Sequence, residues 1–281
     1  MRTRGHIDYK KNPGKDAEIK FGNLCNLKCA MCSPYNSSLI AKEYEDMKSK
    51  GMSHQLIERK VPDINVWYED ESLLTKVAKQ MNEMSLIKFS GGEPTINSYL
   101  SDFLRQIDNK QTQIQITTNG NNWPEKLHNE VLKFSDIKIT LSLDGYGGVN
   151  EYIRYPSSWR KIQKNIEKMK EICNSATGRL VMNSTVASYN VHRLGELCDW
   201  ASTMDFWEWQ FHTVYNPNIF HPSNASDKMK DKFFQDMKKY KQLKVLEPNV
   251  TKKGVGLKGT KEYLGLLDKQ RGTDISVLEL D

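Results

Sequence analysis

The chain has 281 residues, with 41 Lys and Arg against 35 Asp and Glu, which gives a formal net charge of +6 at pH 7. Hydrophobic residues make up 38% and charged residues 27%, which is typical of a folded globular protein and excludes a disordered or fibrous one. Because no apolar run approaches the roughly 20 residues of a membrane helix, and the N-terminus lacks the apolar core of a secretory signal, we expect a cytoplasmic protein with no membrane partner.

Short β-type runs alternate with helical patterns from residue 16 onward. The predicted strands are 17–23, 85–94, 113–118, 136–145, 179–188 and 206–215. The predicted helices are 37–50, with Ser as its N-cap, then 97–109, 124–134, 158–174 and 194–204. Strict alternation predicts parallel strands with crossover helices, hence an α/β fold. Six units are too few for a closed eight-unit barrel, so we expect a partial (β/α)6 barrel of parallel strands.

Three regions lie outside this alternation. Residues 1–15 form an N-terminal extension to a barrel at 16–215, residues 51–70 are predicted to be an insertion, and 216–281 are predicted to form a short α-rich C-terminal extension with a final helix ending near Arg271. A lysine-rich stretch at 227–244 contains interspersed acidic residues, as on a solvated helix face. Nucleic acid is therefore disfavoured as a partner.

Three of the five cysteines form the sequence CNLKCAMC, directly after the first predicted strand. Cys25, Cys29 and Cys32 have the spacing C-x3-C-x2-C, which suits three corners of a cubane iron–sulfur cluster with one iron left open. A structural zinc site needs four closed ligands, and His54 would have to complete a Cys3His set. Three free thiols on one loop would be prone to oxidation. The spacing therefore favours an open-iron cluster over zinc or free thiols.

The cysteine spacing resembles the signature of the radical S-adenosylmethionine (radical SAM) superfamily. GGEP at 91–94 ends the second predicted strand, where that superfamily has the loop that holds the methionyl amino group. ITTNG at 116–120 and LSLDG at 141–145 resemble the third- and fourth-strand segments, and YIRYP at 152–156 resembles a region with a SAM-contacting Arg. The resemblance covers about residues 16–215. It is greatest to the SPASM/twitch-related branch, whose members modify peptides and proteins.

Two features depart from that branch. Met31 stands before the third cysteine, where an aromatic residue is common, but family members use the backbone at this position near the adenine. No cysteine follows Cys198, and Cys173 with Cys198 cannot supply the ligands of an auxiliary cluster. The segment 263–275 nevertheless resembles the end of twitch-type members. We therefore expect a single cluster.

The resemblance implies that Cys25, Cys29 and Cys32 hold a 4Fe–4S cluster and that SAM chelates its open iron. One electron would then split the sulfonium into methionine and a 5′-deoxyadenosyl radical, which abstracts hydrogen from the substrate. Glycines at 91 and 92 allow backbone carbonyls to approach an ammonium closely. The SAM-binding residues that the resemblance implies are Met31, Gly91, Gly92, Glu93, Pro94, Asn119, Ser142, Asp144 and Arg154.

Several of these residues also have purely structural interpretations. Glu93 either holds the loop and accepts a hydrogen bond, or is an acidic residue favoured by a helix N-terminus. Ser142 and Asp144 suit the ribose or the methionyl group, whereas Asp144 and Asn119 also suit turns. Arg154 suits a carboxylate in bidentate geometry, or is a surface charge. No catalytic residue beyond the cluster is assigned.

The last predicted strand alternates aromatic and polar residues. Its aromatic stripe, Trp207, Trp209 and Phe211, is typical of core packing rather than of a substrate box. His212, Thr213 and Tyr215 would lie at the open end of the barrel, where a structural role is favoured over a substrate contact. The isolated Cys173 and Cys198 are expected to be buried thiols.

The leading hypothesis is a radical SAM enzyme that acts on a peptide, a protein side chain or a small metabolite, with an electron donor such as flavodoxin or ferredoxin. One alternative is a radical SAM enzyme that modifies nucleic acid, which the dispersed charge disfavours. Another is a non-catalytic iron–sulfur or zinc-binding module, which would have no need for a GGEP loop.

Overall fold

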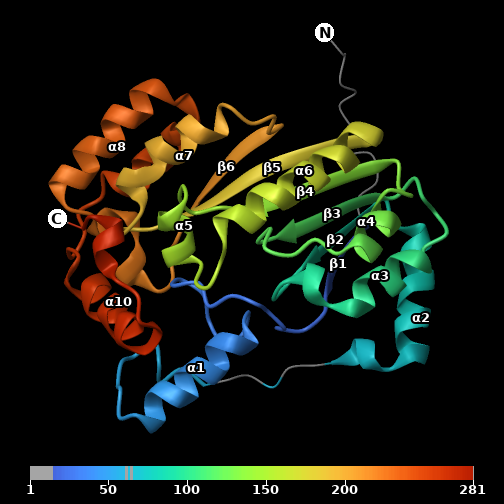
Figure 1. Ribbon diagram of the computed structural model, residues 1–281, viewed down its shortest axis with the longest axis horizontal. Helices are drawn as coiled ribbons and strands as arrows, with labels where there is room; N and C mark the ends of the chain where they lie inside the picture. Colours follow the sequence, from blue (N-terminus) through green and yellow to red (C-terminus); the bar gives the residue numbers. More distant parts are fainter. Residues whose placement is uncertain (1–14, 61–62, 64–65, 281) are drawn as a thin grey trace.

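The computed structural model describes residues 15–60, 63 and 66–280. Nearly all of the expected N-terminal extension, and residues 61, 62, 64 and 65 of the expected insertion, lie outside this range. Six parallel strands form one sheet in the order in which they occur in the chain (Figure 1). The strands are β1 (Asp16–Lys20), β2 (Leu86–Ser90), β3 (Gln113–Thr118), β4 (Asp136–Ser142), β5 (Thr177–Val186) and β6 (Glu208–Thr213).

Helices connect the strands, as the alternation predicts, and the fold is an α/β partial barrel. The helices before β6 are α1 (Ser38–Ser49), α2 (Glu71–Gln80), α3 (Ser98–Arg105), α4 (Glu125–Val131), α5 (Gly148–Ile153), α6 (Trp159–Ser175) and α7 (Leu194–Ala201). Those after β6 are α8 (Asp227–Lys239), α9 (Glu247–Val250) and α10 (Lys258–Arg271).

Side-chain caps explain where several helices begin. Ser37 accepts a hydrogen bond from the Ile40 amide, which confirms the predicted serine cap of α1. Asn97 caps α3 and Ser158 caps α6 in the same way. Each cap satisfies an amide that the first helical turn leaves without a backbone partner.

The two faces of the sheet differ in character. On one face Ile87, Phe89 and Ile116 are fully buried beneath helices, and Figure 1 shows α2, α3, α4 and α6 on one side of the strands. The register places Lys88 of β2, Gln115 of β3 and Lys138 of β4 in one row on the opposite face. These side chains are half-buried, as expected for the inner face of an open barrel.

Three helices of the described chain were not predicted: α2, α5 and the four-residue α9. The short α5 begins at Gly148, directly after Gly147, and glycine weakens a helical pattern. The helix α2 follows the expected insertion, and its signal was the Asp70 cap, which accepts a hydrogen bond from the Leu73 amide. The final helix does end at Arg271, as expected.

The aromatic stripe that runs from Trp207 into β6 lies only partly in the hydrophobic core. Phe211 is buried, Trp209 is half-buried against Tyr240, and Trp207 is 39% exposed, which departs from the expected core packing. The reason is that β6 lies at the edge of the sheet and pairs only with β5. Of the two isolated cysteines, Cys198 is buried and Cys173 is half-buried. None of the helices in the described part of the chain has the length and apolar character needed to cross a membrane.

Candidate functional site

The cysteine loop connects β1 to α1 at the carboxyl edge of the sheet. Cys25, Cys29 and Cys32 are all half-buried free thiols. The loop is fixed by its backbone, because the Lys28 amide donates to the Tyr155 carbonyl at 2.5 Å and the Ala30 amide to the Ile153 carbonyl at 2.8 Å. The segment around α5 therefore supports the loop from one side.

Burial makes these thiols poor acids in the absence of a metal. It raises the pKa of Cys25 and of Cys32 to about 12, and it also raises that of Cys29, against the opposing charge of Arg154. Within the described residues, no three His, Cys, Asp or Glu side chains converge closely enough to hold one metal ion. His54 instead packs on Tyr263, with ring centroids 5.0 Å apart. A cubane cluster needs no such convergence, because each thiolate binds a different iron.

The glycine pair after β2 lies directly against the start of the cysteine loop. Gly91 and Gly92 both have positive φ, +79° and +53°. A Cβ on Gly92 would come within 2.3 Å of the Leu24 carbonyl oxygen, so only glycine fits there. The next amide, that of Glu93, donates to the same carbonyl at 2.8 Å. The two loops are thus a single packed unit.

Glu93 is a buried anchor for this unit, with 2% of its surface exposed. Its Oε1 accepts hydrogen bonds from the hydroxyls of Thr95 and Thr118, both at 2.7 Å, and its Oε2 accepts one from the Asn119 amide at 2.7 Å. Burial raises the pKa of Glu93, and these hydrogen bonds oppose that effect. Glu93 therefore joins the end of β2 to the end of β3.

Asn119 extends the connection back to the cysteines. Its Nδ2 donates to Asn26 Oδ1 at 2.8 Å, within the cysteine loop. Pro94 is buried behind Glu93 and begins a short 3₁₀ turn, and Met31 is half-buried against the core. These predicted residues lie beside the cysteine loop or directly behind it.

Asp144 and Arg154 form a buried ion pair. Arg154 Nε lies 2.7 Å from Asp144 Oδ2, and the other carboxylate oxygen accepts the Thr185 amide at 2.7 Å. Arg154 Nη1 lies 4.0 Å from Cys29 Sγ. Although burial opposes the charge of the guanidinium, Asp144 raises the pKa of Arg154. Both carboxylate oxygens of Asp144 thus contact protein groups, and Arg154 places a fixed positive charge beside the cysteine loop.

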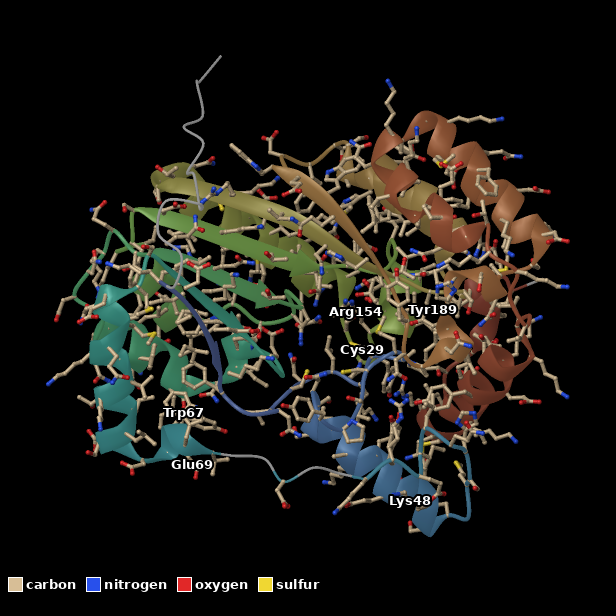
Figure 2. The ribbon with its side chains drawn as sticks, turned by 180° about the vertical axis from the view of Figure 1, so that it is seen from behind. Cys29, Lys48, Trp67, Glu69, Arg154 and Tyr189 are labelled. Carbon is tan, nitrogen blue, oxygen red and sulfur yellow. The ribbon has the colours of Figure 1, made fainter. Side chains whose placement is uncertain are left out.

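Two polar residues at this edge were missed by the sequence analysis. Asn183 pairs in register with Ser142, and its buried Oδ1 has no hydrogen-bond partner among the described residues. Tyr189 follows β5, is fully buried, and its hydroxyl also has no partner in the described part of the chain. Figure 2 shows Tyr189, Arg154 and Cys29 close together in one region. The signal for both was their place at the carboxyl end of β5, where ligand contacts gather in parallel barrels.

A second buried carboxylate supports the cysteine loop from the side of α1. Glu43 receives two hydrogen bonds from Arg271 of α10, at 2.9 and 2.6 Å, and its Oε1 lies 2.7 Å from Lys28 Nζ. Burial favours the neutral acid, but Arg271 and then Lys28 hold the pKa of Glu43 below its usual value. Lys28 stands between Cys25 and Cys29, so this ion network ties the cysteine loop to the C-terminal helix.

The predicted residues at the end of β6 lie apart from this cluster of contacts. Tyr215 is 63% exposed and its hydroxyl accepts a hydrogen bond from Asn249, which also donates to Thr213. His212 is exposed in the row of β6 that pairs with Thr185. None of the three is tied to the cysteine loop by a hydrogen bond or ion pair in the described residues.

The donor set at the carboxyl edge fits a cluster with one open iron and an amino-acid ligand. It combines three neighbouring thiols, a glycine turn that exposes backbone and a buried guanidinium with a hydroxyl and an amide oxygen that have no partner in the part of the chain the structure describes. A soft thiolate set of this kind binds iron–sulfur clusters. The guanidinium suits a carboxylate, and the exposed backbone oxygens suit an ammonium.

Comparison with known proteins places this geometry in a family. Residues 19–188 match the model of the radical SAM superfamily. No match is found among curated protein sequences. Among solved structures, the chain is similar to native anSMEcpe with bound AdoMet, at 20% identity and a TM-score of 0.53, over 83% of this chain and 62% of that one.

The chain is also similar to Streptococcus suis SuiB bound to S-adenosylmethionine, at 15% identity and a TM-score of 0.51, over 83% of this chain and 48% of that one. For SuiB bound to precursor peptide SuiA the sequence identity is 13% and the TM-score is 0.50. The match covers 89% of this chain and 54% of that one. The chain thus spans less than two thirds of the length of each, and at these identities the likeness is one of fold. Because the family model covers more than half of the sequence, the chain belongs to the radical SAM superfamily, whose enzymes bind a 4Fe–4S cluster and SAM.

Proposed function

We propose that this enzyme uses one 4Fe–4S cluster, held by Cys25, Cys29 and Cys32, to cleave SAM reductively and to abstract hydrogen from a peptide or protein substrate. When bound, the cluster supplies the electron that splits SAM into methionine and a 5′-deoxyadenosyl radical, which removes a hydrogen atom from the substrate. The observation that carries the proposal is the packing of the Gly91–Pro94 turn and Arg154 against the two sides of the cysteine loop.

The residues around the loop have separate roles in this proposal. Gly91 and Gly92 expose backbone oxygens to the methionyl ammonium, while Glu93 and Pro94 fix the turn. Asn119 joins that turn to the cysteine loop, and the Met31 backbone lies next to the adenine. Arg154 binds the methionyl carboxylate through the guanidinium edge that Asp144 leaves free.

In this proposal, residues of β4 and β5 bind the ribose of SAM. The hydroxyl of Ser142 and the Asn183 oxygen, which has no partner among the described residues, are adjacent in the sheet register. Vicinal hydroxyls could donate to the Asn183 oxygen and exchange hydrogen bonds with the Ser142 hydroxyl. In this assignment Asp144 contributes by orienting Arg154 rather than by touching SAM.

A peptide or protein substrate is favoured over a small metabolite by two features. The inner face of the sheet presents a row of polar side chains across several strands, and such a surface suits an extended, hydrogen-bonding ligand. SuiB, which has a similar fold, is bound to precursor peptide SuiA in one solved structure. We propose that residues 16–215 form the unit that performs the chemistry, with an insertion at 51–70 and an extension at 216–281 that supports α1.

The electron donor in this proposal is a low-potential protein such as flavodoxin or ferredoxin, and the location is the cytoplasm. Reducing surroundings keep thiols of this kind free of disulfides. The sequence contains no cysteine after Cys198, so the proposal includes no auxiliary cluster.

The decisive experiment is anaerobic reconstitution followed by reduction with dithionite in the presence of SAM. We expect about four iron atoms per chain for a single cubane, and formation of 5′-deoxyadenosine, measured by chromatography. The Cys29→Ala variant should lose both, whereas Cys173→Ala, which removes a half-buried thiol from α6, should retain both. A zinc-loaded protein, or a cluster that never cleaves SAM, would instead indicate a non-catalytic metal-binding module.

A further inference from the structure

Two lysines on the inner face of the sheet have no counter-charge. Lys88 of β2 and Lys138 of β4 are half-buried, and the register places them in one row with Gln115 of β3 between them (Figure 1). Neither ammonium group makes an ion pair or a hydrogen bond with any residue in the described part of the chain. Neighbouring strands lie about 4.8 Å apart, so the backbone positions of the two lysines are roughly 10 Å apart.

The other cations of this face have carboxylate partners. Arg179 of β5 continues the row and pairs with Asp136, and Lys20 of β1 lies 3.6 Å from Glu18. Among the described residues of the inner face, the cations without a partner are therefore the two lysines of β2 and β4.

Glu208 of β6 does not supply the missing counter-charge. It acts electrostatically on Lys138 but forms no ion pair with it, and its carboxylate instead accepts a hydrogen bond from Gln210 Nε2 at 3.0 Å. Burial, together with the positive charges of Arg179 and Lys88, lowers the pKa of Lys138, although Glu208 opposes this effect. A bound anion would relieve the strain between these cations, because it favours the charged form of each lysine.

The lysine row lies on the same face as the residues proposed to bind SAM. Ser142 follows Lys138 by four residues on β4, and alternate residues of a strand share a face. At about 3.3 Å per residue, these two backbone positions are roughly 13 Å apart, and the lysine side chain covers part of that distance. An extended peptide advances by about 3.3–3.6 Å per residue. An anion held by the lysines would thus belong to a substrate residue close in sequence to the one at the SAM site.

The chemistry of this row suits a carboxylate better than a phosphate. Phosphate sites commonly add backbone amides at the N-terminus of a helix. The strands that carry the row, β2, β3 and β4, are each paired on both sides, so their backbone amides serve the sheet. Gln115, between the lysines, offers a side-chain amide that can donate to the second oxygen of a carboxylate.

We propose that Lys88 and Lys138 select an acidic substrate, and that they bind the side-chain carboxylate of an Asp or Glu close in sequence to the residue that loses its hydrogen. This inference rests on the proposed function, because it takes the inner face as the surface that the peptide or protein substrate covers. It makes the two lysines determinants of specificity. It also explains why they have no partner on a face where the other cations are paired.

The test measures which peptides the SAM-loaded holoenzyme binds. The probe is a library of short random peptides with acetylated N-termini and amidated C-termini, so that only side chains carry charge. Bound peptides are separated anaerobically by size exclusion and sequenced by mass spectrometry. We expect the peptides bound by the wild type to be enriched several-fold in Asp and Glu relative to Lys and Arg.

The variants change the charge of the row. The double substitution Lys88→Glu and Lys138→Glu should reverse the preference, because like charges across an interface oppose binding. Lys88→Gln with Lys138→Gln should abolish the preference without reversing it, and this pair decides the question if the charge-reversed protein fails to fold. The matched control is Lys161→Glu with Lys164→Glu, which alters the net charge equally at exposed positions of α6 and should keep the wild-type preference.

A second measurement locates the contact. Acylation of lysines by a succinimidyl ester, mapped by mass spectrometry, should be slowed at Lys88 and Lys138 when an enriched acidic peptide is bound, and unchanged at Lys161. Lys138 is a suitable reporter because its lowered pKa leaves more of the reactive free amine. Acidic peptides that bind without protecting the two lysines would overturn the proposal. So would a preference for acidic peptides that both double variants of the row retain.

Failure of the proposed function gives a different pattern. If the wild type cleaves SAM but retains no peptide, or retains acidic and basic peptides equally, the proposal for the lysines is refuted and the SAM chemistry stands. If the reconstituted and reduced wild type forms no 5′-deoxyadenosine, the proposed function is wrong, and the substrate role of the inner face with it.

Discussion

Two buried glutamates hold the cysteine loop from opposite sides, and they are satisfied in opposite ways. Glu93 has no ion pair within residues 15–60, 63 and 66–280 and relies on hydroxyl and amide donors. Glu43 is clamped by two cations, Arg271 and Lys28. Correspondingly, the pKa of Glu93 is raised by burial, whereas that of Glu43 is lowered by its partners despite burial.

The difference follows from where the partners come from. Glu93 bonds to groups at the ends of neighbouring parallel strands, which the sheet register brings to one edge. Glu43 depends on Arg271, far away in the sequence, and on the packing of α10 against α1, where the hydroxyls of Tyr44 and Tyr263 meet at 2.6 Å. One anchor belongs to the strand edge, and the other joins the barrel to its C-terminal helix.

Glu43→Ala should have the largest effect on stability. The substitution leaves Arg271, whose side chain is only 3% exposed, without its counter-charge. Breaking a buried pair by removing one partner costs about 3–5 kcal/mol. We expect a loss of this size in the free energy of unfolding, measured by denaturant titration at pH 7.

The matched control is Glu262→Ala, on α10. Glu262 pairs with Lys258 at 4.0 Å and its side chain is 59% exposed, so its loss should cost well under 1 kcal/mol. Equal losses for the two variants would show that Glu43 does not anchor the loop.

Glu93→Gln should have a smaller effect. The side-chain oxygen of a glutamine can still accept hydrogen bonds from the Thr95 and Thr118 hydroxyls. Its NH2 group would then face the Asn119 backbone amide, so two donors would meet without an acceptor. A buried donor without an acceptor costs about 1–3 kcal/mol. We expect that loss in the free energy of unfolding, together with reduced iron content after reconstitution.

Glu83→Gln is the corresponding control, because Glu83 is an exposed residue in the turn before β2. It should match the wild type in both measurements. A Glu93→Gln variant that also matched the wild type would mean that the hydrogen bonds to Glu93 do not support the turn.

The sequence could predict the residues of the site that lie in short motifs or at the ends of parallel strands. Cys25, Cys29, Cys32 and Gly91 to Pro94 lie within short motifs, whose chemistry depends on spacing along the chain. Asn119 and Asp144 could be placed at the same edge because parallel strands end together. The order and type of the six strands follow from the alternation of apolar runs and helical patterns.

The partners of these residues were beyond sequence reasoning. No local sequence pattern predicts that Glu43 pairs with Arg271, or that the carboxylate of Asp144 pairs with Arg154. In the sequence Tyr189 looks like any aromatic residue after a strand, and only the structure shows that its buried hydroxyl has no hydrogen-bond partner within residues 15–60, 63 and 66–280. Tertiary packing decides which polar groups are satisfied, and local patterns do not record it.

The smallest expected effect is a pH dependence of opposite sign for the two glutamates. The folded pKa of Glu43 is below its unfolded value of 4.5, so the unfolded state binds more protons between the two values. Its stabilisation is therefore complete above pH 4.5 and is lost as pH falls through the folded pKa. The folded pKa of Glu93 is above 4.5, so its contribution becomes less favourable as pH rises through the interval above that value.

A tenfold difference in the acid dissociation constant between the folded and unfolded states corresponds to about 1.4 kcal/mol of stability. The measurement is the denaturation midpoint of the wild type, Glu43→Gln and Glu93→Gln from well below pH 4 up to pH 7, taken as differences from the wild type so that any acid lability of the cluster is common to all three. Because the two carboxylates titrate on opposite sides of 4.5, the Glu43→Gln difference should shrink as pH falls, whereas the Glu93→Gln difference should grow. Two difference curves of the same sign would show that the side chains are satisfied alike and that the contrast between the two anchors is not one of charge.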